Sequence, residues 1–304
     1  MHIPNGFLTD PVCTATTLAS AGAIGYGFAR IREAEGSRGA AWMAATGAGI
    51  FAAQMVNFPV SGGTSGHVIG AALAAIVLGP WRGMLTMAVV LAVQCLAFGD
   101  GGFGVLGANL LNMAVVSTLV ASGIYTLTTG RVAGTTGKLL GAALASAGSV
   151  MAAATLCAIE LAASGTYAFA EVLSAMLSIH LLIALCEAVI TTTVLAAGLA
   201  IAAENKTFSP RSVAIGGLAL AVAVAGLLAP LASSSPDGLE RVAVDLQFAG
   251  LANQTYAAVA PDYELPGIAW PMAAVALAGI GGVLLVFASN YLVARTAKVR
   301  VRKR

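Results

Sequence analysis

Long apolar runs make up most of this chain and limit what it can fold into. They number nine and fall at about residues 12–31, 40–58, 67–79, 82–98, 103–127, 139–163, 172–203, 213–231 and 268–292. A bilayer core about 30 Å thick requires roughly 20 apolar residues per helix, and only 9% of the 304 residues are charged. We therefore predict an all-α polytopic membrane protein of about nine transmembrane helices. The third run, starting at His67, is short for a full span and follows a glycine-rich loop that we expect to dip into the membrane.

Several classes of function are excluded by what the sequence lacks. Nine spans leave no room for a large soluble catalytic domain. A net charge of +2, with a basic run only in the last seven residues, makes nucleic acid an unsuitable partner. The segment GRVAGTTGKLL at 130–140 does not match the phosphate-binding pattern GxxxxGK[ST], and HExxH is absent. We predict no enzyme activity, no ATP hydrolysis by this chain alone and no organic cofactor.

Basic residues predict the orientation, because cytoplasmic loops are enriched in Lys and Arg. The first apolar run has neither a preceding positive charge nor a clear cleavage site, so we expect the mature chain to begin at Met1. With that N-terminus outside, Arg241 is the one basic residue on the external side. The others are then all cytoplasmic: Arg30, Arg32, Arg38, Arg82, Arg131, Lys138, Lys206, Arg211, Arg295, Lys298, Arg300, Arg302, Lys303 and Arg304.

The chain divides at its most polar break, ENKTFSPRS, which we interpret as a linker at residues 204–212. Seven helices precede it, in residues 1–203. Two helices follow it, in residues 213–304, and they flank an external loop at 232–267. We expect this loop to cover or shape the entrance to a site on the external side.

Three histidines, His2, His67 and His180, all fall on the external side in this topology. His2 has a special property because of its place next to the terminus. One metal ion can be bound together by a free terminal amine, the next peptide nitrogen and the imidazole of residue two. These three nitrogens close fused chelate rings on the ion once the amide loses its proton. A second imidazole, for which His67 is the natural candidate, completes a planar nitrogen set that suits Ni(II) or Cu(II) better than Zn(II) or Mg(II). A bulky second residue also disfavours removal of Met1. The alternative is an incidental His on a frayed terminus.

Other polar residues at membrane depth are candidates for supporting or pathway roles. His180 and Glu187 share one helix face about 10 Å apart, and a carboxyl group deep in a span is a functional candidate. An equally good interpretation of Glu187 is a neutral acid that pairs two helices. The same choice, between orienting a ligand imidazole and pairing helices, applies to five amides: Gln54, Asn57, Gln94, Asn109 and Asn112.

Several stretches resemble the nickel/cobalt substrate-capture components of energy-coupling-factor transporters. They are MHIPNGFL at 1–8, AAQMVNFPVSGGTSGHVIGAALAAIVLGPW at 52–81, GVLGANLLNM at 104–113 and HLLIALCEAVIT at 180–191. In the second unit SSSPDGLERVA at 233–243 resembles the PDGLE signature of the family's small accessory subunit. We therefore interpret the chain as a fusion of the two.

The resemblance implies that the Met1 amine, the His2 amide and imidazole, and His67 hold the metal. It also implies a transmembrane coupling protein and a pair of cytoplasmic ATPases as partners, in the cytoplasmic (inner) membrane of a bacterium. Pro4 resembles the nickel branch of the family, whereas Asn5 departs from the acidic residue usual at that position. The alternatives are Co(II) uptake by the same mechanism, a proton-coupled secondary metal transporter that uses Glu187 and His180, and a structural or enzymatic role.

Overall fold

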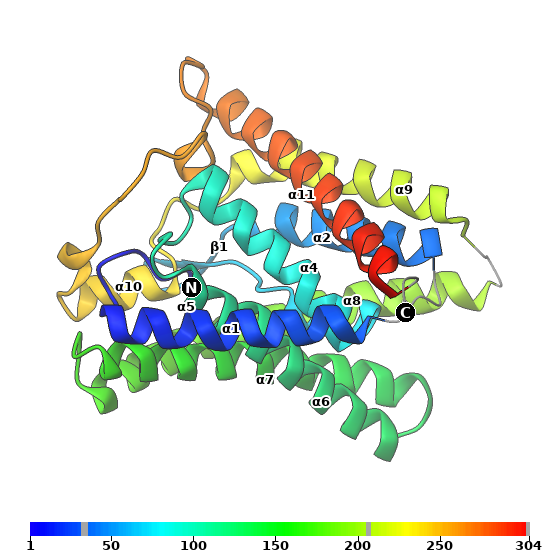
Figure 1. The fold of residues 1–304 in the computed structure, drawn as a ribbon, viewed down its shortest axis with the longest axis horizontal. Helices are drawn as coiled ribbons and strands as arrows, with labels where there is room; N and C mark the ends of the chain where they lie inside the picture. The colour runs from blue at the N-terminus through cyan, green and yellow to red at the C-terminus, as the bar shows by residue number, and fades with distance from the viewer. Residues whose placement is uncertain (32–35, 205–207, 302–304) are drawn as a thin grey trace.

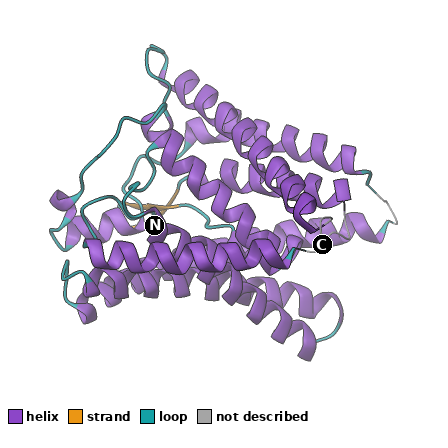
Figure 2. Ribbon diagram, viewed as in Figure 1, coloured by secondary structure: helices purple, strands orange, loops and turns teal. Residues whose placement is uncertain are grey.

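A computed structural model describes residues 1–31, 36–204 and 208–301, and helices make up most of them (Figures 1 and 2). The first unit contains α1 (Asp10–Arg30), α2 (Gly36–Gln54), α3 (Ala71–Leu78), α4 (Pro80–Val93), α5 (Leu106–Asn109), α6 (Ser117–Arg131), α7 (Gly134–Ala163) and α8 (Phe169–Ala203). After the linker come α9 (Pro210–Ala223), α10 (Gly238–Asp245) and α11 (Pro271–Val301). Wider π-helical turns extend three of these helices, at Gln94–Phe98, Leu110–Val116 and Val224–Leu228.

The predicted class, an all-α membrane protein, is confirmed. Each of the nine apolar runs overlaps a helix, and the third run yields the short helix α3. Among the described residues, six helical stretches are long and apolar enough to cross a membrane: Pro80–Phe98, Leu106–Arg131, Gly134–Ala163, Phe169–Ala203, Pro210–Leu231 and Pro271–Thr296. The total of nine spans stays a prediction.

The structure differs from the sequence expectation between α2 and α3, where the main chain forms a β-hairpin. Strand β1 (Phe58–Ser61) pairs with β2 (Thr64–Gly66) in an antiparallel ladder. The turn consists of Gly62 and Gly63, both at positive φ, which a two-residue hairpin turn favours. The second run therefore stops being helical after Gln54, because the chain reverses in the hairpin instead of continuing along the α2 axis.

The two units share their packing. Residues of α2 and α4 form one apolar core with α9 and α11. The small helix α10 belongs to the larger core of the first unit, in which Leu239, Val242 and Ala243 are almost completely buried. The second unit thus inserts α10 into the end of the bundle that also holds the N-terminus (Figure 1).

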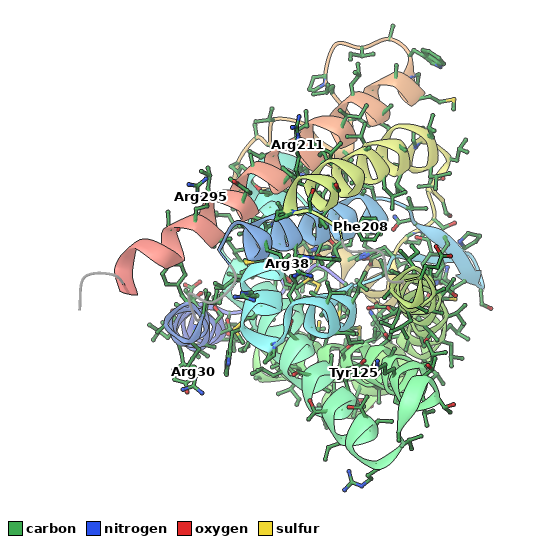
Figure 3. The ribbon with its side chains drawn as sticks, turned by 90° about the vertical axis from the view of Figure 1, so that its right-hand side faces the viewer. Arg30, Arg38, Tyr125, Phe208, Arg211 and Arg295 are labelled. Carbon is green, nitrogen blue, oxygen red and sulfur yellow. The ribbon has the colours of Figure 1, made fainter. Side chains whose placement is uncertain are left out.

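Basic residues gather at the opposite end of the bundle. Figure 3 views that end, where Arg30, Arg38, Arg211 and Arg295 lie at or near helix termini. Arg241 lies on α10, at the other end. Such a charge separation is what a positive-inside topology requires, and the side of the membrane that each end faces stays a prediction. Part of the predicted linker and several cationic residues lie outside the described residues: Arg32, Lys206, Arg302, Lys303 and Arg304.

Candidate metal centre

The N-terminal segment is buried and held by specific hydrogen bonds. Met1 is 5% exposed and His2 is 8% exposed. The side chain of Asn109, at the end of α5, accepts a hydrogen bond from the Ile3 N–H (2.8 Å) and donates one to the Ile3 carbonyl (3.1 Å). The N–H of Gly102 donates to the same carbonyl at 2.9 Å. The terminus is therefore fixed inside the fold, beside α5 (Figure 1).

Asn5, two residues after Ile3, also holds the N-terminal segment in place. Its Oδ1 accepts a hydrogen bond from the Gly104 N–H at 2.9 Å, and its Nδ2 donates to the Thr255 hydroxyl at 3.0 Å. The main chain of Asn5 also pairs with Asn253. The amide at this position therefore connects the N-terminal segment to loops of both units, which is a structural role.

The β-hairpin places His67 next to the N-terminal amine. Nε2 of His67 lies 3.3 Å from the Met1 nitrogen, and the rings of His2 and His67 are stacked with centroids 5.5 Å apart. Nδ1 of His67 lies 3.0 Å from the carbonyl oxygen of Val68. Because a carbonyl only accepts, Nδ1 carries the proton and Nε2 presents its lone pair toward the amine.

Glu187 and Gln54 fix the main chain that follows His67. The Glu187 carboxyl oxygens accept hydrogen bonds from the N–H groups of Ile69 (2.6 Å) and Gly70 (2.9 Å). Nε2 of Gln54 donates to the Ile69 carbonyl at 2.8 Å. Both side chains are buried. They act on the loop between β2 and α3, so their effect on the centre is to position His67.

His2 is oriented by two polar partners. Nε2 of its ring lies 3.2 Å from Oε1 of Gln94, and Nδ1 lies 3.0 Å from Oδ1 of Asp100. The hydroxyl of Tyr263 donates to the other carboxylate oxygen of Asp100 at 2.5 Å. Burial works to raise the pKa of Asp100, but the charge and hydrogen bond of His2, together with the Tyr263 hydroxyl, lower that pKa to about 2.

A second carboxylate, Asp237, contacts the amine itself. Oδ2 of Asp237 lies 2.5 Å from the Met1 nitrogen and 3.6 Å from Nε2 of His67. Burial works to lower the pKa of the Met1 ammonium, whereas the charge and hydrogen bond of Asp237 outweigh burial and raise that pKa. Burial works in the opposite direction on Asp237, yet the ammonium holds its pKa well below the usual value. Asp237 and the Met1 ammonium therefore form an ion pair.

His180 lies behind this contact and is 1% exposed. Its Nδ1 lies 2.8 Å from the Met176 carbonyl oxygen, which makes Nδ1 the protonated nitrogen. Nε2 has no hydrogen-bond partner within the described part of the chain. A cavity of about 10 Å³ touches His180 together with Met1, His67 and Asp237. The structure therefore places His67 next to both other histidines: its ring stacks on that of His2, and it shares this small cavity with His180.

The other predicted amides play more distant roles. Nδ2 of Asn112 donates to Oε2 of Glu160 at 2.7 Å, so this residue pairs α7 with the π-helical turn after α5. Asn57 contributes its main-chain carbonyl, which accepts from the Ser233 N–H at 2.8 Å, and it lines the wall of a wider cavity. Asp100, Asp237 and Tyr263 were not predicted as site residues. Of these three residues, only Asp237 carried a signal in the sequence, which was its position inside the PDGLE motif.

The donor set fits a metal centre only when main-chain nitrogens are included. Among the described residues no three His, Cys, Asp or Glu side chains form a metal-binding group. Two nitrogen ligands about 2 Å from an ion and at right angles to each other lie about 2.8 Å apart, and the Met1 amine and Nε2 of His67 are 3.3 Å apart. For the chelate to form, Nδ1 of His2 must give up its contact with Asp100 and bind the ion instead. A cavity of about 680 Å³, lined by His2, His67, Asp100 and Asp237 among others, gives access to the centre.

Two family models match this chain, each over a different part of it. Residues 2–205 match the family model of the cobalt uptake substrate-specific transmembrane region, CbiM, and residues 211–299 match that of the PDGLE domain. The NikMN protein of Archaeoglobus fulgidus is 36% identical over 98% of this chain and 99% of its own length. The fused nickel transport protein NikMN of Rhodobacter capsulatus is 37% identical over 53% of this chain and 46% of its own. The crystal structure of a transition metal transporter aligns with a TM-score of 0.61 and 32% identity, over 66% of this chain and 93% of that one.

Proposed function

Because this chain belongs to the family of cobalt uptake substrate-specific transmembrane proteins and carries a PDGLE domain, we propose that it captures Ni(II) on the external face as the substrate-specific component of an energy-coupling-factor importer. The family comprises nickel and cobalt transport proteins, which are not enzymes. The chain is an integral multi-pass membrane protein. Residues 1–203 form the capture unit in this proposal, 204–212 the linker and 213–304 the accessory unit.

The ligands in this proposal are the Met1 amine, the deprotonated amide and Nδ1 of His2, and Nε2 of His67. The observation that carries the proposal is the 3.3 Å approach of Nε2 of His67 to the Met1 nitrogen, in a place where both residues are under 10% exposed. Ile3 and Asn109 hold the terminus there, and Glu187 with Gln54 holds the loop after His67. His180 lies directly behind and is available to a metal that moves inward.

Nickel is favoured over cobalt by the geometry of the donors. Three nitrogens from a chelate formed by consecutive residues lie in one plane, and a fourth in that plane rewards an ion that prefers square-planar nitrogen coordination. Ni(II) has that preference, whereas Co(II) favours more ligands. Co(II) uptake at the same centre is the second candidate, and the match to the cobalt uptake family model favours it.

The energy for import would come from partners, since the chain has no phosphate-binding loop of its own. In this proposal a transmembrane coupling protein and a pair of cytoplasmic ATPases bind the bundle and drive release of the metal inward. The basic helix ends that carry Arg30, Arg38, Arg211 and Arg295 mark the end that would face the cytoplasm (Figure 3).

The test is the metal content of protein that carries a tag only at its C-terminus, beside a variant extended by a few residues before Met1. We expect stoichiometric nickel and a yellow, diamagnetic species in the first, and no nickel in the second, because the extension converts the terminal amine into an amide. The same extension placed at the C-terminus is the control and should leave nickel bound. Equal nickel with and without the N-terminal extension would refute the chelate.

A further inference from the structure

We propose that Asp237, which the PDGLE unit contributes, is a positioning residue of the metal centre that holds the Met1 amine beside His67 before the metal arrives. This inference rests on the proposed function and adds to it a residue from the second unit. Asp237 Oδ2 lies 2.5 Å from the Met1 nitrogen and 3.6 Å from Nε2 of His67. It therefore touches two groups of the proposed chelate, which belong to segments 66 residues apart in the chain.

The carboxylate of Asp237 is held in place because it also caps a helix. Its other oxygen, Oδ1, accepts hydrogen bonds from the N–H groups of Leu239 (2.9 Å) and Glu240 (3.0 Å) and thereby caps the N-terminus of α10. The Glu240 carboxylate in turn accepts from the Asp237 N–H at 3.0 Å, which completes a capping box. Since turning the carboxylate away would break the cap, Oδ2 is held in the direction of the amine.

The motif that carries Asp237 is docked on the hairpin that carries His67. The Ser65 N–H donates to the Pro236 carbonyl at 2.9 Å, and the Ser65 hydroxyl donates to the Ser235 carbonyl at 2.6 Å. On the other side of Asp237, Leu239 is completely buried. These contacts fix the distance between the second unit and His67, so Asp237 can set the position of the terminal amine relative to the imidazole.

The same carboxylate also suits the loaded centre. When Ni(II) binds, the ammonium and the His2 amide each give a proton to water, and the proton that Nδ1 of His2 donates toward Asp100 must leave that nitrogen as well. The ion with one deprotonated amide carries a net charge of +1, equal to that of the ammonium it replaces. Asp237 therefore neutralises the centre in both states, and it has no electrostatic reason to leave when the metal enters.

The experiment compares D237N with D245N in the full-length protein. Asn caps a helix as well as Asp does, so D237N keeps the cap of α10 and loses the charge beside the amine. Asp245 is on the same helix, and its partner is Arg241 at 2.9 Å on the helix surface. D237S, a second substitution that retains a capping side chain, covers the case in which D237N folds poorly.

Two quantities are measured: the rate at which an acylating reagent modifies the Met1 amine in metal-free protein, and the affinity for Ni(II) by titration. In D237N the released amine should react roughly tenfold faster, since a charge-assisted hydrogen bond is lost. The affinity should fall by about 10- to 100-fold, as for other residues that orient metal ligands. D245N should match the wild type in both.

Wild-type rates and affinity in both D237N and D237S would overturn the inference. That outcome is distinct from failure of the proposed function, which appears as equal nickel in the unmodified and N-terminally extended proteins. If the extension abolishes nickel binding while both Asp237 variants bind and react normally, the chelate stands and Asp237 has no part in it.

Discussion

Glu187 forms two hydrogen bonds that no amide can reproduce together. Both of its carboxyl oxygens accept from main-chain N–H groups, those of Ile69 and Gly70. In an E187Q variant one of these N–H groups would face the NH2 of Gln, which is a donor. We expect this buried mismatch to lower the stability of the protein by about 1–3 kcal/mol. The loop after His67 should loosen, and nickel affinity should fall while uptake is weakened but not abolished.

The measurements for E187Q are the thermal unfolding temperature in detergent and uptake of radioactive nickel. E171Q is the matched control, because Glu171 lies on the same helix and is exposed, so both quantities should stay at wild-type values. The result also separates two mechanisms. Complete loss of uptake by a well-folded E187Q variant that still binds nickel would favour a proton-coupled transporter over an ATP-driven importer.

Sequence patterns singled out the nitrogen-bearing residues of the proposed centre but not its carboxylates. His2, His67 and His180 stood out because histidines are rare in this chain and all fall on one side of the predicted topology. Asp100 and Asp237 occur in polar loops, where acidic residues are normally solvated. Only the tertiary contact with the buried terminus gives them a role, and no local pattern encodes that contact. For Glu187 the membrane depth was predictable, whereas its main-chain partners on another element were not.

At the scale of elements, α10 brings the second unit to the centre through a glycine. A Cβ atom added to Gly238 would lie 2.8 Å from Cε1 and 2.9 Å from Nε2 of His180, closer than atoms in contact allow. G238A should therefore push α10 away from α8, because the imidazole is buried. We expect a loss of stability of about 1–3 kcal/mol, typical of overpacking, together with weaker nickel binding.

Thermal unfolding and nickel titration of three variants test this packing. G250A is the control, since Gly250 has no atom within 4 Å of an added Cβ, and it should behave as the wild type. The double variant H180A/G238A removes the obstructing ring and should recover part of the stability that G238A loses. If G238A unfolds at the wild-type temperature, the close packing of α10 on His180 is not a constraint on the protein.

The elements that the sequence misplaced are those in which helices are interrupted. The apolar pattern of residues 40–58 continues past the end of α2, and periodicity alone does not distinguish a helix end from a short strand in such a run. The π-helical turns at Gln94–Phe98 and Leu110–Val116 were likewise not predicted. The first of them contains Gln94, which contacts His2, and the second begins just after Asn109, which holds Ile3. Such wide turns are frequent at functional sites.

For the whole molecule, the fold class and the family were predictable because both depend on features spread along the entire chain. The long apolar runs require membrane helices whatever their packing. The motifs at the N-terminus, at 52–81 and at 233–243 occur in both units, and the family matches confirm the resemblance over 2–205 and 211–299. The insertion of α10 beside Met1 was not predictable, since it depends on how the two units pack against each other.

The positions of the basic helix ends predict the direction in which the bundle crosses the membrane. The centre, with Met1 and α10, lies at one end, and the helix ends that carry Arg30, Arg38, Arg211 and Arg295 lie at the other (Figures 1 and 3). Because Lys and Arg are retained on the cytoplasmic side, the centre should face outward. Only an outward centre can take metal from the medium.

Single cysteines test this orientation in a background from which the four natural cysteines, Cys13, Cys95, Cys157 and Cys186, have been removed. G250C marks the end that holds the centre, and T136C marks an exposed position at the start of α7, near the opposite end. In intact cells a membrane-impermeant maleimide should label G250C and leave T136C unlabelled until the membrane is opened. Nickel content of the background protein shows that the centre is intact. The reverse labelling pattern would place the centre in the cytoplasm, where it could export or store metal but could not capture it for import.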